Sequence, residues 1–253
     1  MTSVTSSARN ATLSSVAGVV VPDSKLAREV TELVRDTEPP LLFHHSSRVY
    51  YWGALAGKRR RLRFDPELLY AGAMFHDMGL TLTHASAHER FEVDSANAAR
   101  DFLGSHGIAE REIETVWTAI ALHTTPGIPP HMHPVIALVT AGVEMDVLGI
   151  AFSEFTEAER EAVVRAHPRP GRFKEEIIQA FYDGFHRKPE TTFGTVNAKR
   201  ARRQGSLLPA REFLPSDPRF RLARLNRSNQ DVGNPTTIAA VQSRKCHHQG
   251  ARR

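Results

Sequence analysis

Residues 68–80 read LLYAGAMFHDMGL, an apolar stretch that ends in an adjacent histidine and aspartate. Leu69 and Ala73 precede His76 by seven and three residues, so a helix places all three side chains on one face. The imidazole of His76 then points toward the protein core. Because a single core histidine is usually only hydrogen-bonded, this stretch predicts a site only if other buried polar groups join it.

Two further polar residues lie on apolar helical faces. His45 shares a stripe with Val49 and Trp52, and Asp146 shares one with Val139. An isolated buried carboxylate is prohibitively costly, so Asp146 must be paired, protonated or bound to a metal. Two imidazoles and two carboxylates from three helices can satisfy one another by sharing one divalent cation inside a bundle.

Helical periodicity continues almost without interruption from residue 24, and no Val/Ile/Thr alternation is long enough to predict a strand. Asp65 and Pro66 form a typical helix start, and Gly107 and Gly149 lie where helices are expected to end. We therefore predict one all-α domain, a bundle of about eight helices. The expected helices cover residues 24–37, 41–57, 65–78, 90–106, 109–124, 134–148, 156–166 and 173–187.

Composition and charge divide the chain into three parts. Residues 1–23 are rich in Ser, Thr and Ala and are expected to be a disordered leader. The body covers residues 24–198. Residues 199–253 hold 13 of the 33 basic and 3 of the 28 acidic residues, a net charge of +10, which leaves −5 for the rest. This basic tail has no sustained period and is expected to be disordered.

Several classes of protein are excluded by composition. The chain has a single cysteine, Cys246, which excludes an intrachain disulfide and a cysteine-based zinc or iron–sulfur site. No apolar run approaches the ~20 residues of a membrane span, and the leader lacks the pattern of a secretory signal. We therefore expect a cytoplasmic protein without membrane contact.

The order His45, His76-Asp77, Asp146 on consecutive helices resembles the HD-domain superfamily of metal-dependent hydrolases. The surrounding words resemble its cyanamide hydratase family, known especially from fungi, over about residues 25–198. These words are FHHSSRVYYWG (43–53), LLYAGAMFHDMGL (68–80), RFEVDSANAARDFL (90–103), VWTAIALHTTPGI (116–128), VTAGVEMDVLG (139–149) and KPETTFGTVNA (188–198).

The resemblance implies one HD-type helical domain in residues 24–198, with His45, His76, Asp77 and Asp146 as metal ligands. The family pattern has Asn before the first ligand, whereas this chain has His44, so either His44 or His45 could bind. Helix phase favours His45, because His44 lies on the side of the polar residues Arg48 and Tyr51.

Differences from other HD branches narrow the range of expected reactions and the expected number of metals. Phosphodiesterases of the superfamily have Lys, and bacterial deoxynucleotidases have Glu, where this chain has Leu80. Binuclear members have a further His where this chain has Phe91. We therefore expect a mononuclear site with one divalent metal, zinc being favoured over Fe, Mn or Ni.

The implied reaction is addition of metal-activated water to a small nitrile-like substrate, cyanamide giving urea. Besides Asp77, two residues are candidates for catalysis. Glu92 lies at the edge of the core, where burial is expected to raise its pKa for proton transfer, whereas Asp94 is expected to be solvated. His123, on the stripe of Val116 and Ile120, is expected to line the substrate pocket, with a core or second-metal role as alternatives.

Other hypotheses remain open. An HD-type phosphohydrolase acting on a nucleotide or other small phosphate ester, or a hydrolase of another small molecule, is the main alternative. The body is not expected to bind nucleic acid specifically, although the tail could. The expected partner is a small-molecule substrate, with a homo-oligomer as the default state. The Arg-rich run after Ala198 begins inside a family-like word, which is typical of a shifted reading frame or a retained intron.

Overall fold

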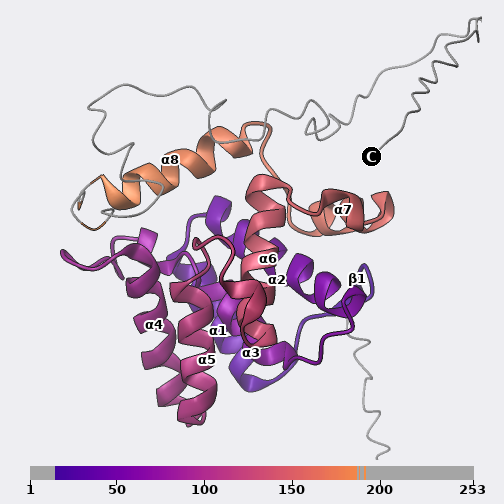
Figure 1. Cartoon of the computed structure of the whole chain (residues 1–253). Coiled ribbons are helices and arrows are strands. Elements are labelled where there is room, and N and C mark those ends of the chain that lie inside the picture. Colours follow the sequence, from indigo (N-terminus) through magenta and orange to yellow (C-terminus); the bar gives the residue numbers. More distant parts are fainter. Residues whose placement is uncertain (1–14, 187, 189–190, 192–253) are drawn as a thin grey trace, which may run out of the picture. The chain divides into compact units, whose positions relative to one another are not determined.

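The computed structural model describes residues 15–186, 188 and 191, and these residues form eight α-helices and one short hairpin (Figure 1). The predicted all-α class is confirmed, and each of the eight expected helices is present within a few residues of its predicted bounds. The helices are α1 (Lys25–Thr37), α2 (Pro40–Arg59), α3 (Pro66–Phe75), α4 (Phe91–Ser105), α5 (Glu110–Ala121), α6 (Pro134–Val143), α7 (Glu157–Ala166) and α8 (Phe173–Phe185).

The helix boundaries follow the capping chemistry of the sequence. The Asp65 side chain accepts hydrogen bonds from the backbone N–H groups of Glu67 and Leu68, with Pro66 at the first helical position. Helix α6 continues directly into a π-helical turn at Glu144–Leu148, which periodicity did not predict. Gly149 ends this turn with a φ of +67°.

A short hairpin corrects the prediction for the leader. Strands β1 (Ser15–Val16) and β2 (Val19–Val20) pair in antiparallel fashion, with Val19 buried against the core. The Tyr50 hydroxyl donates a hydrogen bond of 2.7 Å to the Val20 carbonyl. The prediction of disorder is therefore wrong for residues 15–23. Two-residue strands are too short to produce an alternating pattern, and residues 1–14 lie outside the described part of the chain.

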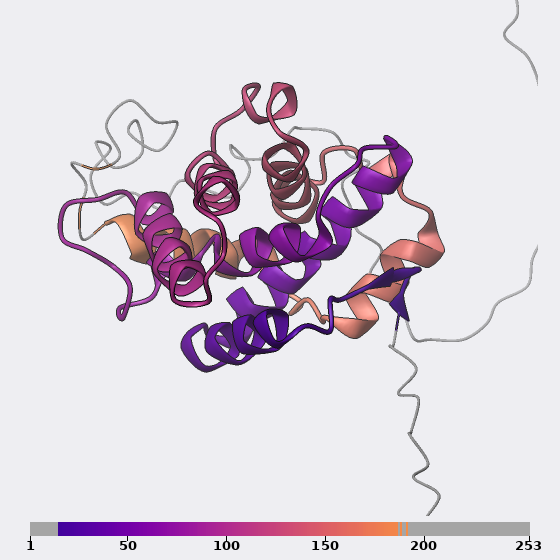
Figure 2. The same cartoon turned by 90° about the horizontal axis from the view of Figure 1, so that it is seen from below.

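Helices α2 and α6 pack unusually closely. A Cβ atom on Gly142 would lie 2.3 Å from the Val49 carbonyl oxygen, and one on Gly53 would lie 2.7 Å from the Leu138 carbonyl oxygen. Only glycine permits these backbone contacts. Figure 2 shows the same helices from below. The close approach brings the turn that follows α6, and Asp146 with it, against the middle of α2.

Helix α8 is held by a second apolar cluster that is separate from the main core. It packs on α2 and on the 3₁₀ turn Met78–Leu80, and it crosses one end of the bundle in Figure 1. The buried residues of this cluster, called here the α8 cluster, are Leu42, Leu80, Phe91, Phe173 and Ile177. Since His76 and Asp77 directly precede the 3₁₀ turn, α8 lies close to them.

The predicted tail, with Cys246 and the hypothesis about its origin, lies outside the described residues. Within the described part of the chain, no helix combines the length and apolar character that crossing a membrane requires.

Candidate metal centre

Three side chains meet in the interior where α2 and the end of α3 come together. His45 lies in the second turn of α2, His76 caps the end of α3, and Asp77 follows it. The Nε2 atoms of His45 and His76 are 3.2 Å apart, and Asp77 Oδ2 lies 3.6 Å and 3.3 Å from them. All three residues are fully buried. Together they form the group whose spacing can hold a metal ion.

Hydrogen bonds on the far side of each ring fix which nitrogen faces the group. Nδ1 of His76 contacts the Ala73 carbonyl at 2.7 Å, and Nδ1 of His123 contacts the Ile120 carbonyl at 2.7 Å. Carbonyl oxygens only accept, so these Nδ1 atoms carry the protons. Nδ1 of His45 contacts Asp146 Oδ2 at 2.7 Å in the same way. In the neutral rings, every Nε2 atom therefore presents an electron pair.

Three of the facing atoms are acceptors that lack donors. Both carboxylate oxygens of Asp77 and Nε2 of His123 are buried without a hydrogen-bond partner, and His123 Nε2 lies 3.7 Å from Asp77 Oδ1. Unpartnered buried acceptors are costly in a folded protein. A divalent cation would satisfy them together, and imidazole nitrogen with carboxylate oxygen is a typical donor set for such an ion. The residues present therefore fit a metal.

The structure does not bring Asp146 into this group. Its carboxylate lies behind His45, on the Nδ1 side of the ring, and Nε2 of the same ring faces His76. A carboxylate in this place fixes the tautomer and the orientation of a ligating histidine. The expectation that Asp146 is itself a ligand stays a prediction, because its position here is that of a residue acting through His45.

Three donors that periodicity did not identify hold Asp146. Arg48 Nε binds Oδ1 at 2.9 Å, Trp52 Nε1 binds the same oxygen at 2.8 Å, and Arg169 Nη2 binds it at 2.7 Å. Burial raises the pKa of Asp146, but Arg169, Arg48 and His45 outweigh it and hold this pKa well below its ordinary value. The signal for Trp52 was its place on the His45 stripe, whereas Arg169 carried none.

His45, and not His44, belongs to the cluster. His44 is only half-buried and lies beside His167, with ring centroids 5.7 Å apart. The structure therefore places in the cluster the histidine that helix phase favours, and its role as the ligand stays a prediction. The side of α2 that carries His44 is not exposed as a whole, because Arg48 and Tyr51 on it are themselves buried. The negative charge of Asp146 compensates the desolvation cost of burying the Arg48 guanidinium.

Electrostatics favour a charged Asp77 and a neutral His123. Burial alone raises the pKa of Asp77, but His76 and the other imidazoles outweigh it and lower this pKa to about 2. Burial, reinforced by His76, lowers the pKa of His123 to about 4. At neutral pH Asp77 is therefore an anion, and His123 is a neutral ring with a free electron pair on Nε2.

Glu92 and Asp94 both differ from expectation. Glu92 is buried, and Arg90 Nη2 and Thr124 Oγ1 bind its Oε1 at 2.6 Å and 2.5 Å. Burial raises its pKa, but Arg90, His123 and Thr124 outweigh burial and lower it, so the predicted rise is wrong. Asp94 is buried rather than solvated, because Lys188 Nζ pairs with its Oδ2 at 2.5 Å.

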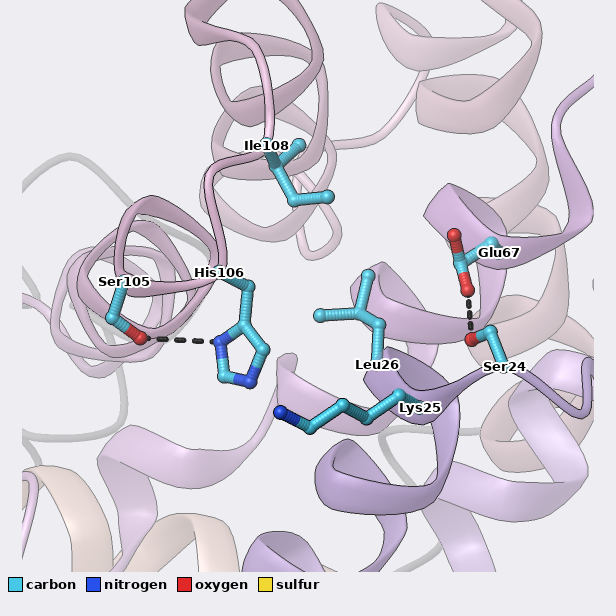
Figure 3. Close-up of a pocket in the computed structure, with 7 residues that line it drawn as sticks. All are labelled: Ser24, Lys25, Leu26, Glu67, Ser105, His106 and Ile108. Carbon is cyan, nitrogen blue, oxygen red and sulfur yellow. Dashed lines mark hydrogen bonds between the residues drawn. The ribbon is translucent and has the colours of Figure 1, made fainter.

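A surface pocket of about 490 Å³ lies elsewhere, where the start of α1 faces the end of α4 (Figure 3). Ser24 is hydrogen-bonded to Glu67 on one side of it, and Ser105 to His106 on the other. The lining residues are Ser24, Lys25, Leu26, Glu67, Ser105, His106 and Ile108. No member of the metal cluster lines this pocket, so it is separate from the candidate centre.

We expect an ion pair at the rim of this pocket to stabilise the fold only in mildly acidic solution. Nε2 of His106 binds Glu29 at 2.5 Å, and this hydrogen bond raises the pKa of His106 and lowers that of Glu29. The stabilisation is present above the ordinary pKa of Glu29, 4.5, and below that of His106, 6.5. It is lost as pH rises through the folded pKa of His106.

The variant His106→Gln should therefore lower the melting temperature at pH 5.5 by at most about 2 °C and leave it unchanged at pH 8.5. Thermal melts of both proteins at the two pH values measure this. An equal decrease at both values would contradict the ion-pair explanation.

Comparisons with known proteins agree with this geometry. The family model of the HD domain matches residues 42–213. The match includes His45, the His76-Asp77 pair and Asp146. A search of curated proteins found no match to the chain.

Proposed function

Because this chain belongs to the HD-domain family, whose members are typically metal-dependent hydrolases, we propose that it is a metal-dependent hydratase acting on a small nitrile-like molecule, with cyanamide as the substrate and urea as the product. One divalent metal, zinc being the favoured ion, is held by His45, His76 and Asp77, with Asp146 orienting His45.

The observation that carries the proposal is a buried group of metal-binding atoms, of which both Asp77 oxygens and His123 Nε2 lack a hydrogen-bond partner. Asp77 and the Nε2 atoms of three imidazoles face one another in a fully buried place. When bound there, the metal supplies a Lewis acid that makes water a nucleophile at neutral pH. The chain supplies the dry surroundings, and the hydrogen bonds on Nδ1 keep each Nε2 directed at the cation.

The surroundings of the cluster favour a neutral substrate over a phosphate ester. The rings that cover it are apolar, with Phe173 6.1 Å from the His45 ring and Phe91 5.7 Å from the His123 ring. Phosphate recognition commonly uses Arg or Lys. The basic side chains described around the cluster are already paired with carboxylates. These pairs are Arg48 and Arg169 with Asp146, Arg90 with Glu92, and Lys188 with Asp94.

Glu92 and His123 are the proposed catalytic residues besides Asp77. Glu92 is held as an anion by Arg90 and Thr124, so it is suited to accept a proton from the attacking water and, once protonated, to pass this proton to the developing imide nitrogen of the substrate. His123 is neutral, and its unpartnered Nε2 faces Asp77. It is placed to hold the substrate by a hydrogen bond at this nitrogen.

Urea formation from cyanamide by the purified protein tests the proposal. We expect turnover that is lost on removal of the metal by a chelator and regained on adding back zinc. A screen for phosphate release from nucleoside monophosphates should be silent with the same preparation. Metal analysis of the protein comes first. Bound metal without urea formation would contradict the proposed substrate and support the proposed metal centre.

A further inference from the structure

The metal cluster is closed to solvent in the structure. His45, His76 and Asp77 have no exposed surface, and His123 is 2% exposed. A substrate therefore reaches these residues only after part of the protein moves. The part that moves must be one of the segments that cover the cluster.

Helix α8 covers the cluster and packs there through a small set of apolar residues. It contributes Phe173 and Ile177 to the α8 cluster, which is separate from the main core. Two of its partners there lie beside the metal cluster: Phe91 contacts the His123 ring, and Leu80 lies three residues after Asp77. Elements held by a few apolar contacts open locally at lower free energy than the core.

The two ends of α8 are held in different ways. At its start, the Phe173 ring lies 4.7 Å from Cζ of Arg48 and 4.6 Å from Cζ of Arg169, the two arginines that bind Asp146. Cation–π contacts of this kind keep the start of the helix on the Asp146 network. Beyond its end, Lys188 Nζ binds Asp94 Oδ2 at 2.5 Å and the Ser86 carbonyl at 3.2 Å.

The contact at the C-terminal end of α8 is tight. A Cβ atom on Gly184 would lie 2.4 Å from Cδ2 of Leu80, so the helix backbone rests directly on this side chain. Asp94 is itself beside the site, because a Cβ atom on Gly79 would lie 2.8 Å from its Cβ. Release of the Lys188–Asp94 pair would therefore free the end of α8 directly over the Asp77 turn.

We propose that α8 is a hinged cover of the metal cluster, which pivots at Phe173 and is latched by the Lys188–Asp94 ion pair. Opening separates Gly184 from Leu80 and exposes the Phe91 and His123 side of the cluster. The Phe173 contacts stay in place, so the orientation of His45 by Asp146 is preserved. The inference rests on the proposed function in taking this cluster as the reactive centre.

A reversible tether tests the cover. The variant Leu80→Cys/Gly184→Cys, with Cys246→Ser to remove the third thiol, removes the crowding at Leu80 and sets two cysteines within disulfide reach. Chelator-treated full-length protein is labelled with diethylpyrocarbonate, and the modified histidines are located by mass spectrometry. This readout needs neither metal nor turnover, so it is independent of the substrate assignment.

We expect oxidation to slow labelling of His123 by about tenfold or more, and reduction to restore it. The exposed His131 should be labelled equally in both states, and Leu80→Cys/Cys246→Ser should not respond to oxidant. Equal labelling of His123 in the oxidised and reduced protein, with the disulfide verified by mass, would overturn the proposal.

The latch has its own test. Lys188→Met should speed labelling of His123 several-fold while amide exchange in α5 stays unchanged, which separates local opening from global unfolding. The matched control is Arg165→Met, which removes an exposed ion pair with Glu161. Faster exchange in α5 to the same extent, or an equal effect of the control, would show that Lys188 is not a latch.

Discussion

The variant Asp77→Asn should lose its metal and its turnover together. Asp77 is the one carboxylate in the group of facing acceptors, and no hydrogen-bond donor compensates its charge. An amide of the same shape keeps one weak acceptor and removes the charge that neutralises a divalent cation. We expect less than about one tenth of the wild-type metal content, and a fall in kcat/KM of more than about 10³-fold.

Metal analysis and the urea assay on the same preparation measure both effects. Asp101→Asn, an exposed position on α4, is the matched control and should change neither. Circular dichroism confirms that the helices are intact. Full metal content in Asp77→Asn would contradict the assignment of Asp77 as a ligand.

Periodicity placed three of the buried polar residues on interior helical faces. His45, His76 and Asp146 were assigned to the interior from apolar neighbours at helical spacing, and all three are buried. The same pattern does not predict which neighbouring group each buried side chain points at. The close approach of α2 and α6 at Gly142 and the π turn place Asp146 on the Nδ1 side of His45, and both features depend on tertiary packing.

The errors around Glu92 have a similar cause. Arg90 precedes α4 with an extended backbone, so a helical projection does not show that its side chain reaches Glu92. Lys188 lies 94 residues after Asp94 in the chain, and only the position of α8 brings the two together. Local sequence alone therefore predicted that Asp94 is exposed to solvent. The long-range ion pair shows that this prediction is wrong.

Asp146→Asn should have the largest effect on stability. Arg48 has no exposed surface, and Arg169 is 13% exposed, and both guanidinium groups bind this carboxylate. Removing the charge leaves two cations in the interior without a counterion. Breaking a buried pair in this way typically costs about 3–5 kcal/mol, so we expect a decrease of that size in the free energy of unfolding. Urea denaturation of the metal-free proteins measures it.

The additional substitution Arg48→Met should recover part of this loss, because one of the two unpaired cations is then removed. No recovery would mean that the charge pairing is not what stabilises this region.

Metal affinity in Asp146→Asn distinguishes the two roles of Asp146. The amide oxygen can still accept the proton on His45 Nδ1, so the ring keeps its tautomer but loses the polarising charge behind it. If Asp146 acts through His45, the affinity should fall by about 10–100-fold, the usual effect of losing such a partner. A loss as complete as that of Asp77→Asn would instead make Asp146 a ligand, as the sequence pattern predicts. Competition titration with a chromophoric chelator on both variants decides between the two.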